Sequence, residues 1–190
     1  MTKKLKLYVG PMFSGKSTKL LQQIDRYKIA KKNILCFKPA MDNRYTGEGF
    51  IVTHNDIHVP CHVINTGRDI IEIFEKENNK NKIDVIAVDE AFMIDNIAQT
   101  LIDIFYGYKI NVLVSSIDIS ASRMPFKDIS MLLSHATHVK KCKAVCTTCG
   151  HDASYTLRKF SIDDNTDQIR VGGADLYEPR CLKHHSDINF

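Results

Sequence analysis

The 190-residue chain contains no apolar run that approaches the roughly 18 residues of a membrane-spanning helix. Its lysine-bearing start, Met1 to Leu7, is not followed by the apolar stretch of a secretory signal. Internal repeats and low-complexity tracts are also missing. We therefore expect a cytoplasmic protein with no membrane partner.

A strong charge of either sign is missing too. The 26 Lys and Arg residues exceed the 22 Asp and Glu residues only slightly, which leaves a net charge of +4. Dedicated nucleic-acid binders are more basic than this, so we expect no nucleic-acid partner, whereas an enzyme that handles anionic substrates fits. A hydrophobic content of 44% is ordinary for a packed core and argues against disorder.

A phosphate-binding loop stands near the start of the chain. Gly10-Pro-Met-Phe-Ser-Gly-Lys-Ser17 lies between the apolar stretch Leu5 to Val9 and a helix-like run that reaches Ala30. Its glycines let backbone N–H groups turn toward phosphate oxygens, Lys16 adds a charge near the β- and γ-phosphates, and the Ser17 hydroxyl suits Mg²⁺. The predicted ATP-binding residues here are Gly10, Pro11, Met12, Phe13, Ser14, Gly15, Lys16 and Ser17.

Strand-like and helix-like runs alternate through residues 1–141. This alternation predicts an α/β fold of the P-loop NTPase (RecA-like) type, a parallel sheet with helices on both faces. In such sheets ligands bind at the carboxyl ends of the strands. The expected strands are Leu5 to Val9, Asn33 to Phe37, Ile83 to Val88 and Ile110 to Ser115, and the expected helices are Lys16 to Ala30, Asp69 to Glu77 and Ile94 to Tyr106.

Two acids follow one of the apolar strands. Asp89 and Glu90 come directly after Ile83 to Val88, at the edge where the phosphate-binding loop would open. A carboxylate at position 89 suits Mg²⁺, and one at position 90 can accept a proton from a hydroxyl or water nucleophile. An exposed acid pair without function is the alternative, and the phosphate-binding loop makes it the weaker one because that loop requires a metal-binding carboxylate.

Asn81-Lys-Ile-Asp84 matches a short pattern that recognises guanine in GTPases. It enters the strand that ends before Asp89, so it should lie at the edge of the sheet opposite the phosphates. We therefore interpret it as a solvated connection.

The last 49 residues change in character, and four of the six cysteines lie between Cys142 and Cys181. In a reducing compartment such cysteines favour metal binding over disulfides. Two knuckles with two intervening residues each predict a closed, structural Zn²⁺ site, with residues 150–180 held at their base by the metal. Cys142 and His185 are neighbouring alternatives with poorer spacing, and Cys36 and Cys61 are expected in the core. The predicted ligands are Cys146, Cys149, Cys181 and His184.

Within residues 142–190, which we expect to form a zinc-binding domain separate from 1–141, short polar strands are predicted at Ala153 to Arg158 and Gln168 to Val171. The acidic and amide residues Asp163 to Asp167 between them suggest a hairpin or an excursion.

The order of these motifs resembles the type II thymidine kinases, the zinc-containing family of cytosolic, bacterial and poxviral enzymes. The resemblance runs almost from end to end. It is carried by Gly10 to Ser17, Asp42-Asn-Arg44-Tyr, Val88-Asp-Glu90, Asp118, Arg123-x-Pro-Phe126, Cys146-x-x-Cys149, Tyr155-Thr-x-Arg158, Val171-Gly-Gly-Ala-Asp-x-Tyr177 and Cys181-x-x-His184.

This resemblance implies transfer of the ATP γ-phosphate to the 5′-hydroxyl of thymidine, with Glu90 as general base. It also implies a homotetramer and a lasso that covers the nucleoside between the zinc knuckles. Arg44 or Arg123 would contact phosphates, because a guanidinium matches phosphate oxygens; a plain surface role is the alternative. The implied substrate-binding residues are Asp42, Phe126, Ile169, Arg170, Val171, Gly172, Gly173 and Tyr177.

Three positions depart from the family pattern. Ala91-Phe-Met93 replaces the usual Gly-Gln-Phe, Asp118 to Ala121 lacks a glycine and an aromatic residue, and Lys127 stands where glycine is common. The hypothesis that follows is weaker thymidine binding, or a pocket that accepts a bulkier base or another deoxynucleoside.

Two other functions compete. Val88-Asp-Glu-Ala91 also resembles the start of a helicase motif, which would suit a nucleic-acid-dependent ATPase with a zinc module. Such motors need a second nucleotide-binding lobe, and the residues after 141 are too few for one. A regulatory zinc protein whose loop senses ATP is the third interpretation.

Overall fold

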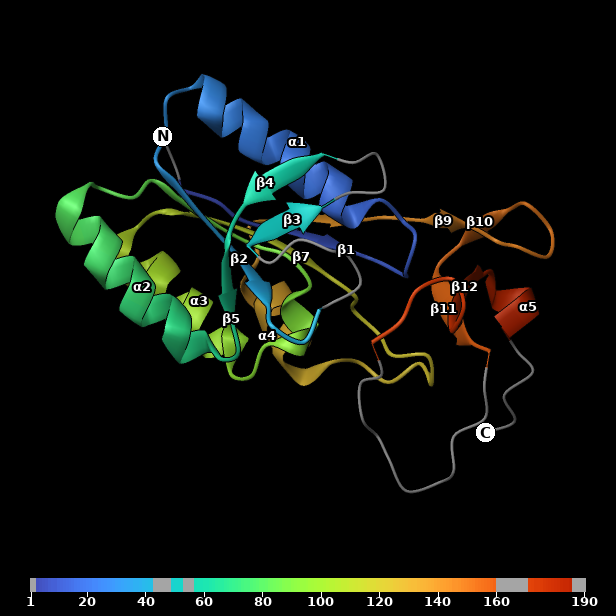
Figure 1. The fold of residues 1–190 in the computed structure, drawn as a ribbon. Coiled ribbons are helices and arrows are strands. Elements are labelled where there is room, and N and C mark those ends of the chain that lie inside the picture. Colours follow the sequence, from blue (N-terminus) through green and yellow to red (C-terminus); the bar gives the residue numbers. More distant parts are fainter. Residues whose placement is uncertain (1–2, 43–48, 53–56, 160–170, 186–190) are drawn as a thin grey trace.

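A six-stranded, fully parallel sheet forms the centre of the computed structural model, which describes residues 3–42, 49–52, 57–159 and 171–185. The strand order is β5-β2-β6-β7-β1-β8 (Figure 1). This confirms the predicted α/β parallel-sheet fold. The strands are β1 Leu5–Val9, β2 Ile34–Pro39, β5 His62–Ile64, β6 Val85–Val88, β7 Asn111–Ser116 and β8 His138–Lys141.

Helices cover both faces of this sheet, as expected. Helix α1, Lys16–Ile29, packs Leu20, Leu21 and Ile24 on one face. Alternate residues of the central strands bury the other face under α2, α3 and α4 (Figure 1). The bounds of these three helices are Gly67–Lys80, Ile97–Tyr108 and Lys127–His135, and a short 3₁₀ turn, η1, spans Ala91–Met93.

Helix α2 begins at Gly67, two residues earlier than predicted. The residues that cap its first turn precede the apolar pattern from which the helix was predicted. Asp69 accepts hydrogen bonds from the backbone N–H groups of Asn65 and Thr66, and Thr66 returns the contact in a capping box. Those N–H donors hold the pKa of the Asp69 carboxyl below its usual value. The predicted helix at Ile94 to Tyr106 starts later, at Ile97, because η1 and a bridge between Thr66 and Asp95 come first.

Several elements were not predicted. The strands β3 Phe50–Val52, β4 His58–Pro60 and β5 are only three residues long, too short for an alternating pattern to stand out. Strand β8 is exposed along its whole length and carries no apolar alternation. It exists because its backbone pairs with β1 from Lys6 to Val9, a contact that only the tertiary fold supplies.

A small second unit follows β8 and lies beside the phosphate-binding end of the sheet (Figure 1). Two antiparallel pairs build it, and the predicted strand Ala153 to Arg158 appears there as two pieces. The excursion at Asp163 to Asp167, and most of the strand Gln168 to Val171, lie outside the described residues. The elements are β9 Ala144–Val145, β10 Asp152–Ala153, β11 Tyr155–Arg158, β12 Tyr177–Arg180 and α5 Leu182–His185.

The GTPase-like pattern, Asn81 to Asp84, lies in the connection between α2 and β6, as predicted. Asp84 precedes β6 and accepts a hydrogen bond from the Asn33 N–H at 3.2 Å, while Lys32 lies 3.6 Å from its other oxygen. Asn81 ends helix α2. These contacts join the amino-terminal ends of β2 and β6, which is the edge opposite Asp89.

Gly10 and Gly107 form a matched pair for a stability test. A Cβ on Gly10 would lie 2.4 Å from the Cys142 carbonyl oxygen, and φ is +147°, whereas a Cβ on Gly107 would meet nothing within 4 Å. We expect Gly10→Ala to lower the free energy of unfolding by about 1–3 kcal/mol, because the backbone at Cys142, just after β8, must move.

Gly107→Ala lies on the exposed side of helix α3 and should raise the free energy of unfolding by about 0.5–1 kcal/mol, since alanine loses less backbone entropy. Urea denaturation measures both variants. Equal stability of the two would contradict the close approach of β1 to residue 142.

Candidate functional site

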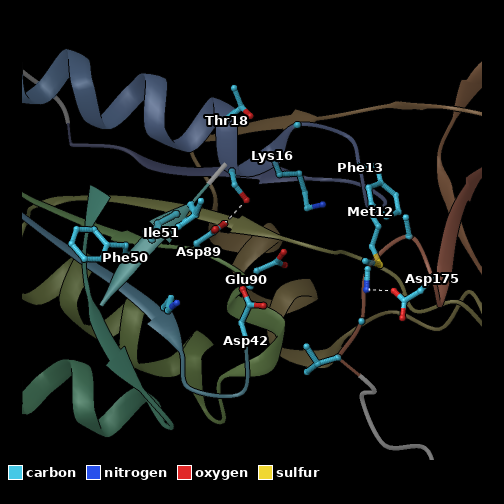
Figure 2. A pocket seen from close by; sticks show the side chains of 18 residues that line it. Met12, Phe13, Lys16, Thr18, Asp42, Phe50, Ile51, Asp89, Glu90 and Asp175 are labelled. Carbon is cyan, nitrogen blue, oxygen red and sulfur yellow. Dashed lines mark hydrogen bonds between the residues drawn. The ribbon is translucent and has the colours of Figure 1, made fainter. Parts of the chain in front are cut away.

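The loop between β1 and α1 has the curled form of a phosphate cradle. Gly15 adopts φ 72° at the start of α1, a conformation that favours glycine. Within the loop, the Lys16 ammonium and the Ser14 hydroxyl both donate to the Pro11 carbonyl oxygen at 2.7 Å. Lys16 is therefore held over the loop, as Figure 2 shows, and the residue is only 5% exposed.

The loop meets Asp89 directly. The Ser17 hydroxyl, on the first turn of α1, donates to Asp89 Oδ1 at 3.0 Å (Figure 2). Adjacent oxygen ligands of Mg²⁺ at about 2.1 Å in an octahedron stand about 3.0 Å apart, so this pair fits that ion. Because Asp89 follows β6 and Ser17 follows β1, the parallel sheet brings the two oxygens together.

Glu90 is held in an unusual backbone conformation. Its φ of 49° and ψ of 44° are left-handed, which is uncommon for a residue with a side chain. The chain turns there from β6 into η1, and the carboxylate points into the site rather than along the strand (Figure 2). Strain of this kind costs energy that the surrounding structure must offset, and it is concentrated at functional sites.

A cavity of about 450 Å³ connects these groups. One end lies under Phe50 and Ile51 of β3, and the other lies beside Phe13 and Asp175 (Figure 2). Among the predicted site residues, the cavity is lined by Met12, Phe13, Gly15, Lys16, Ser17, Asp42, Asp89, Glu90, Val171, Gly172 and Gly173.

Lys38 is a lining residue that the sequence reasoning missed. It is the penultimate residue of β2 and is 8% exposed. It shares a sheet face with Asp89, since Phe37 pairs with Val88 in the preceding register position. A lysine inside the apolar run Ile34 to Pro39 was the available signal. The other lining residues not predicted are Thr18, Phe50, Ile51, Val52, Ala174 and Asp175.

Some predicted residues lie elsewhere. Phe126 and Tyr177 do not line the cavity and belong instead to an apolar cluster with Ile117 and the cavity-lining Met12. The guanidinium of Arg123 donates to His185 and is not among the groups that line the cavity. Gly10, Pro11 and Ser14 shape the loop without lining the cavity, and Arg44, Ile169 and Arg170 lie outside the described residues.

The segment from Val171 to Tyr177 is folded back on itself. Gly173 donates its N–H to Asp175 at 3.0 Å, and Lys159 donates to the Ala174 carbonyl oxygen at 2.7 Å. The Tyr177 N–H reaches the Gly173 carbonyl oxygen at 3.0 Å. Residues 171–175 thus form a braced wall opposite β3.

The two knuckles come together as predicted. The ligand atoms of Cys146, Cys149, Cys181 and His184 all lie within 4.8 Å of one another. The separations are 3.8 Å between the Cys149 and Cys181 sulfurs, and 3.3 and 3.7 Å from His184 Nδ1 to the sulfurs of Cys181 and Cys146. Tetrahedral Zn²⁺ would place such atoms about 3.6–3.8 Å apart, so the cluster fits that ion and leaves no open position.

The thiols of this cluster differ in acidity. Burial opposes ionisation of Cys146, but backbone N–H donors at Cys181, Thr148 and Cys149, together with His184, bring its pKa down to about 5. The backbone N–H of His151 acts in the same direction on Cys149, yet burial and the adjacent thiols raise the pKa of Cys149 above its usual value. We infer that a bound dication would favour ionisation of all three thiols, because its charge offsets the repulsion between neighbouring thiolates.

The alternative ligands are placed outside the cluster. Cys142 is buried against the α1 face of the sheet, and His185 is fully buried with bonds to Thr156 and Arg123. Cys36 packs in the core as expected, and burial raises the pKa of its thiol to about 12. Cys61 is partly buried against the same core, with a pKa raised to about 11 by burial.

The family model for thymidine kinase matches residues 3–185 of the chain. The chain belongs to the thymidine kinase family. Membership of the thymidine kinases makes it an ATP-dependent kinase and supports thymidine as the phosphate acceptor in general. The Cys₃His cluster agrees with the zinc-containing type II branch of the thymidine kinases. The nucleic-acid-dependent ATPase is not favoured, and no helix within the described residues is long and apolar enough to cross a membrane.

Loss of the zinc cluster should loosen the small unit. We expect Cys149→Ser to bind less zinc and to lower the melting temperature by on the order of 5 °C, because structural zinc binding is coupled to folding. Zinc content by atomic absorption and the melting temperature measure the effect. Cys61→Ser changes a thiol that is outside the cluster and should retain the zinc; an unchanged melting temperature in Cys149→Ser would count against a structural metal.

Proposed function

We propose that the chain transfers the γ-phosphate of ATP to the 5′-hydroxyl of thymidine and forms thymidine monophosphate. The observation that carries the proposal is the single cavity that joins the phosphate-binding loop, the acid pair and residues 171–175. A phosphate donor and a hydroxyl acceptor both need access to such a cavity, with a proton acceptor between them.

The phosphate side of the proposal rests on Lys16, Ser17 and Asp89. Lys16 supplies positive charge to the β- and γ-phosphates, and the N-terminal end of α1 adds its dipole. Ser17 and Asp89 would hold Mg²⁺, as their 3.0 Å contact suits. When bound, the ion neutralises charge that develops on the transferred phosphoryl group.

Glu90 is proposed as the general base. Its carboxylate lies in the cavity next to Asp89, and the left-handed backbone directs it there. A carboxylate that accepts the 5′-hydroxyl proton makes that oxygen a better nucleophile toward the γ-phosphate. Two acids adjacent in sequence thereby receive separate tasks, metal binding and proton acceptance.

The acceptor side of the proposal rests on the wall formed by residues 171–175. Gly172 and Gly173 line the cavity with backbone groups rather than bulky side chains, which suits recognition of the polar edge of a base. Asp42 also lines the cavity, beside the acid pair (Figure 2). We place the nucleoside between this wall and Glu90. We propose that Phe126 and Tyr177 support the pocket through their apolar cluster with Met12.

Further assignments belong to the same proposal. We infer a nucleotide-binding domain at 1–141 and a zinc-binding domain at 142–190, with Zn²⁺ structural. Family membership supports a role in nucleotide salvage, and we propose a cytoplasmic homotetramer.

The altered family positions support a hypothesis about base preference. The Phe92 ring lies 4.9 Å from the Phe126 ring, and Ala121 is buried without an aromatic ring of its own. We therefore propose weaker thymidine binding, or acceptance of a bulkier base or another deoxynucleoside. Kinase activity with a panel of deoxynucleosides tests this hypothesis, and an undiminished preference for thymidine would refute it.

One assay tests the proposed reaction against its rivals. ADP formation from ATP and Mg²⁺ is measured with thymidine, with single-stranded DNA, and with neither. We expect stimulation by thymidine, together with appearance of thymidine monophosphate. Stimulation by DNA alone would establish the ATPase instead, and ATP binding without turnover in any arm would favour a sensor.

Glu90→Gln should retain ATP binding while turnover falls by about 10²–10⁴-fold, because only the proton acceptor is removed. Steady-state kinetics and equilibrium ATP binding measure the two effects. Glu75→Gln, on the exposed side of helix α2, is the control and should behave like the unmodified chain. Near-normal turnover of Glu90→Gln would refute the base assignment.

A further inference from the structure

A buried chain of hydrogen bonds links the zinc-binding unit to the phosphate-binding loop. The Met12 N–H donates to Thr156 Oγ1 at 3.0 Å, and His185 Nε2 contacts the Thr156 carbonyl oxygen at 3.0 Å. Arg123 Nε donates to His185 Nδ1 at 3.1 Å, and its Nη2 donates to the His185 carbonyl oxygen at 3.2 Å. Because Arg123 Nε–H donates to Nδ1, Nδ1 acts as an acceptor. The ring proton of His185 is therefore assigned to Nε2, which can donate it to the Thr156 carbonyl oxygen.

Three members of this hydrogen-bond network are closed off from water, while Arg123 is partly exposed. Met12, Thr156 and His185 are 7%, 5% and 0% exposed. A buried N–H group that loses its acceptor keeps the full desolvation cost. The Met12 N–H therefore depends on the Thr156 hydroxyl, which comes from a strand 144 residues further along the sequence.

The other end of this hydrogen-bond network lies beside the predicted zinc ligands. His185 directly follows the predicted ligand His184 in α5, and Thr156 pairs with Pro179 of β12, two residues before the ligand Cys181. A second contact runs parallel to the hydrogen bonds, since Phe13 packs against the apolar cluster that contains Cys146.

Each of the two loops joined by these hydrogen bonds contains a residue under backbone strain. Phe13, next to Met12, has φ 63°, and Arg123 has φ 61°. Side-chain-bearing residues keep such angles only where surrounding structure holds them. The hydrogen bond to Met12 and the two bonds from Arg123 provide that support on each side of His185.

We propose that Thr156 and His185 are positioning residues through which the zinc-binding unit keeps the phosphate-binding loop in its nucleotide-binding form. The zinc site then sets the affinity for ATP and ADP, in addition to holding the nucleoside wall. This inference rests on the proposed role of residues 10–17 in binding ATP.

Substitution of Thr156 tests the inference at its first link. Thr156→Val keeps the shape and removes the acceptor, and Thr156→Ser keeps the hydroxyl. We expect Thr156→Val to weaken ADP binding about fivefold, the equivalent of one lost hydrogen bond, and to speed amide exchange at Met12, with zinc content unchanged. Thr156→Ser should bind ADP within about twofold of the unmodified chain.

Two results would overturn the inference. One is unaltered ADP affinity and Met12 exchange in Thr156→Val. The other is a loss in Thr156→Ser as large as in Thr156→Val, because that would assign the effect to packing. Neither measurement uses a nucleoside, so a wrong acceptor assignment leaves this test intact. Should ADP fail to bind the unmodified chain, the proposed function fails while Met12 exchange still tests the link.

Substitution of His185 tests the junction. His185→Gln can still donate to Thr156 and accept from Arg123, whereas His185→Leu can do neither. We expect His185→Leu to bind zinc through the intact cluster, yet to lose ADP affinity about fivefold or more, with His185→Gln intermediate. Arg68→Met, which removes an exposed ion pair on α2, is the matched surface control. Equal ADP affinity of His185→Leu and the control, with zinc retained, would refute the role of His185.

Discussion

The parallel register of β6, β7 and β1 is the constraint on which the candidate site depends. Val88 pairs with Val114, and Val9 pairs with Ser116, so the carboxyl ends of these strands meet at one edge of the sheet. The phosphate-binding loop leaves β1 there, and the acid pair leaves β6 there. The 3.0 Å contact between Ser17 and Asp89 is a consequence of that register.

Around this edge the backbone departs from relaxed geometry. Phe13, Glu90 and Arg123 all have positive φ angles between 49° and 63°, and each lies in or beside a segment that borders the site or supports it. The buried core of the sheet and the zinc-binding unit offset that strain. The rigid layers of the fold therefore hold the irregular turns at which the chemistry is proposed to occur.

The small second unit, β9 to α5, contacts the candidate site in more than one place. Its four predicted zinc ligands gather in the same unit that contributes residues 171–175 to the cavity. Its strand β11 gives the Met12 N–H an acceptor, and its apolar cluster receives Phe13. We infer that the predicted zinc cluster supports both residues 171–175 and the phosphate-binding loop, which meet at the same end of the cavity.

Local sequence by itself determined the loop from Gly10 to Ser17, the acid pair, the four clustered candidate zinc ligands and the central strands, because each has a short-range pattern of residue types and spacing. Only the tertiary structure decided the rest. Strand β8 exists through pairing with β1, Lys38 becomes a cavity residue through the face it shares with Asp89, and Arg123 turns to His185 instead of the cavity. These contacts join residues far apart in the chain, and no local pattern encodes which distant partner a side chain meets.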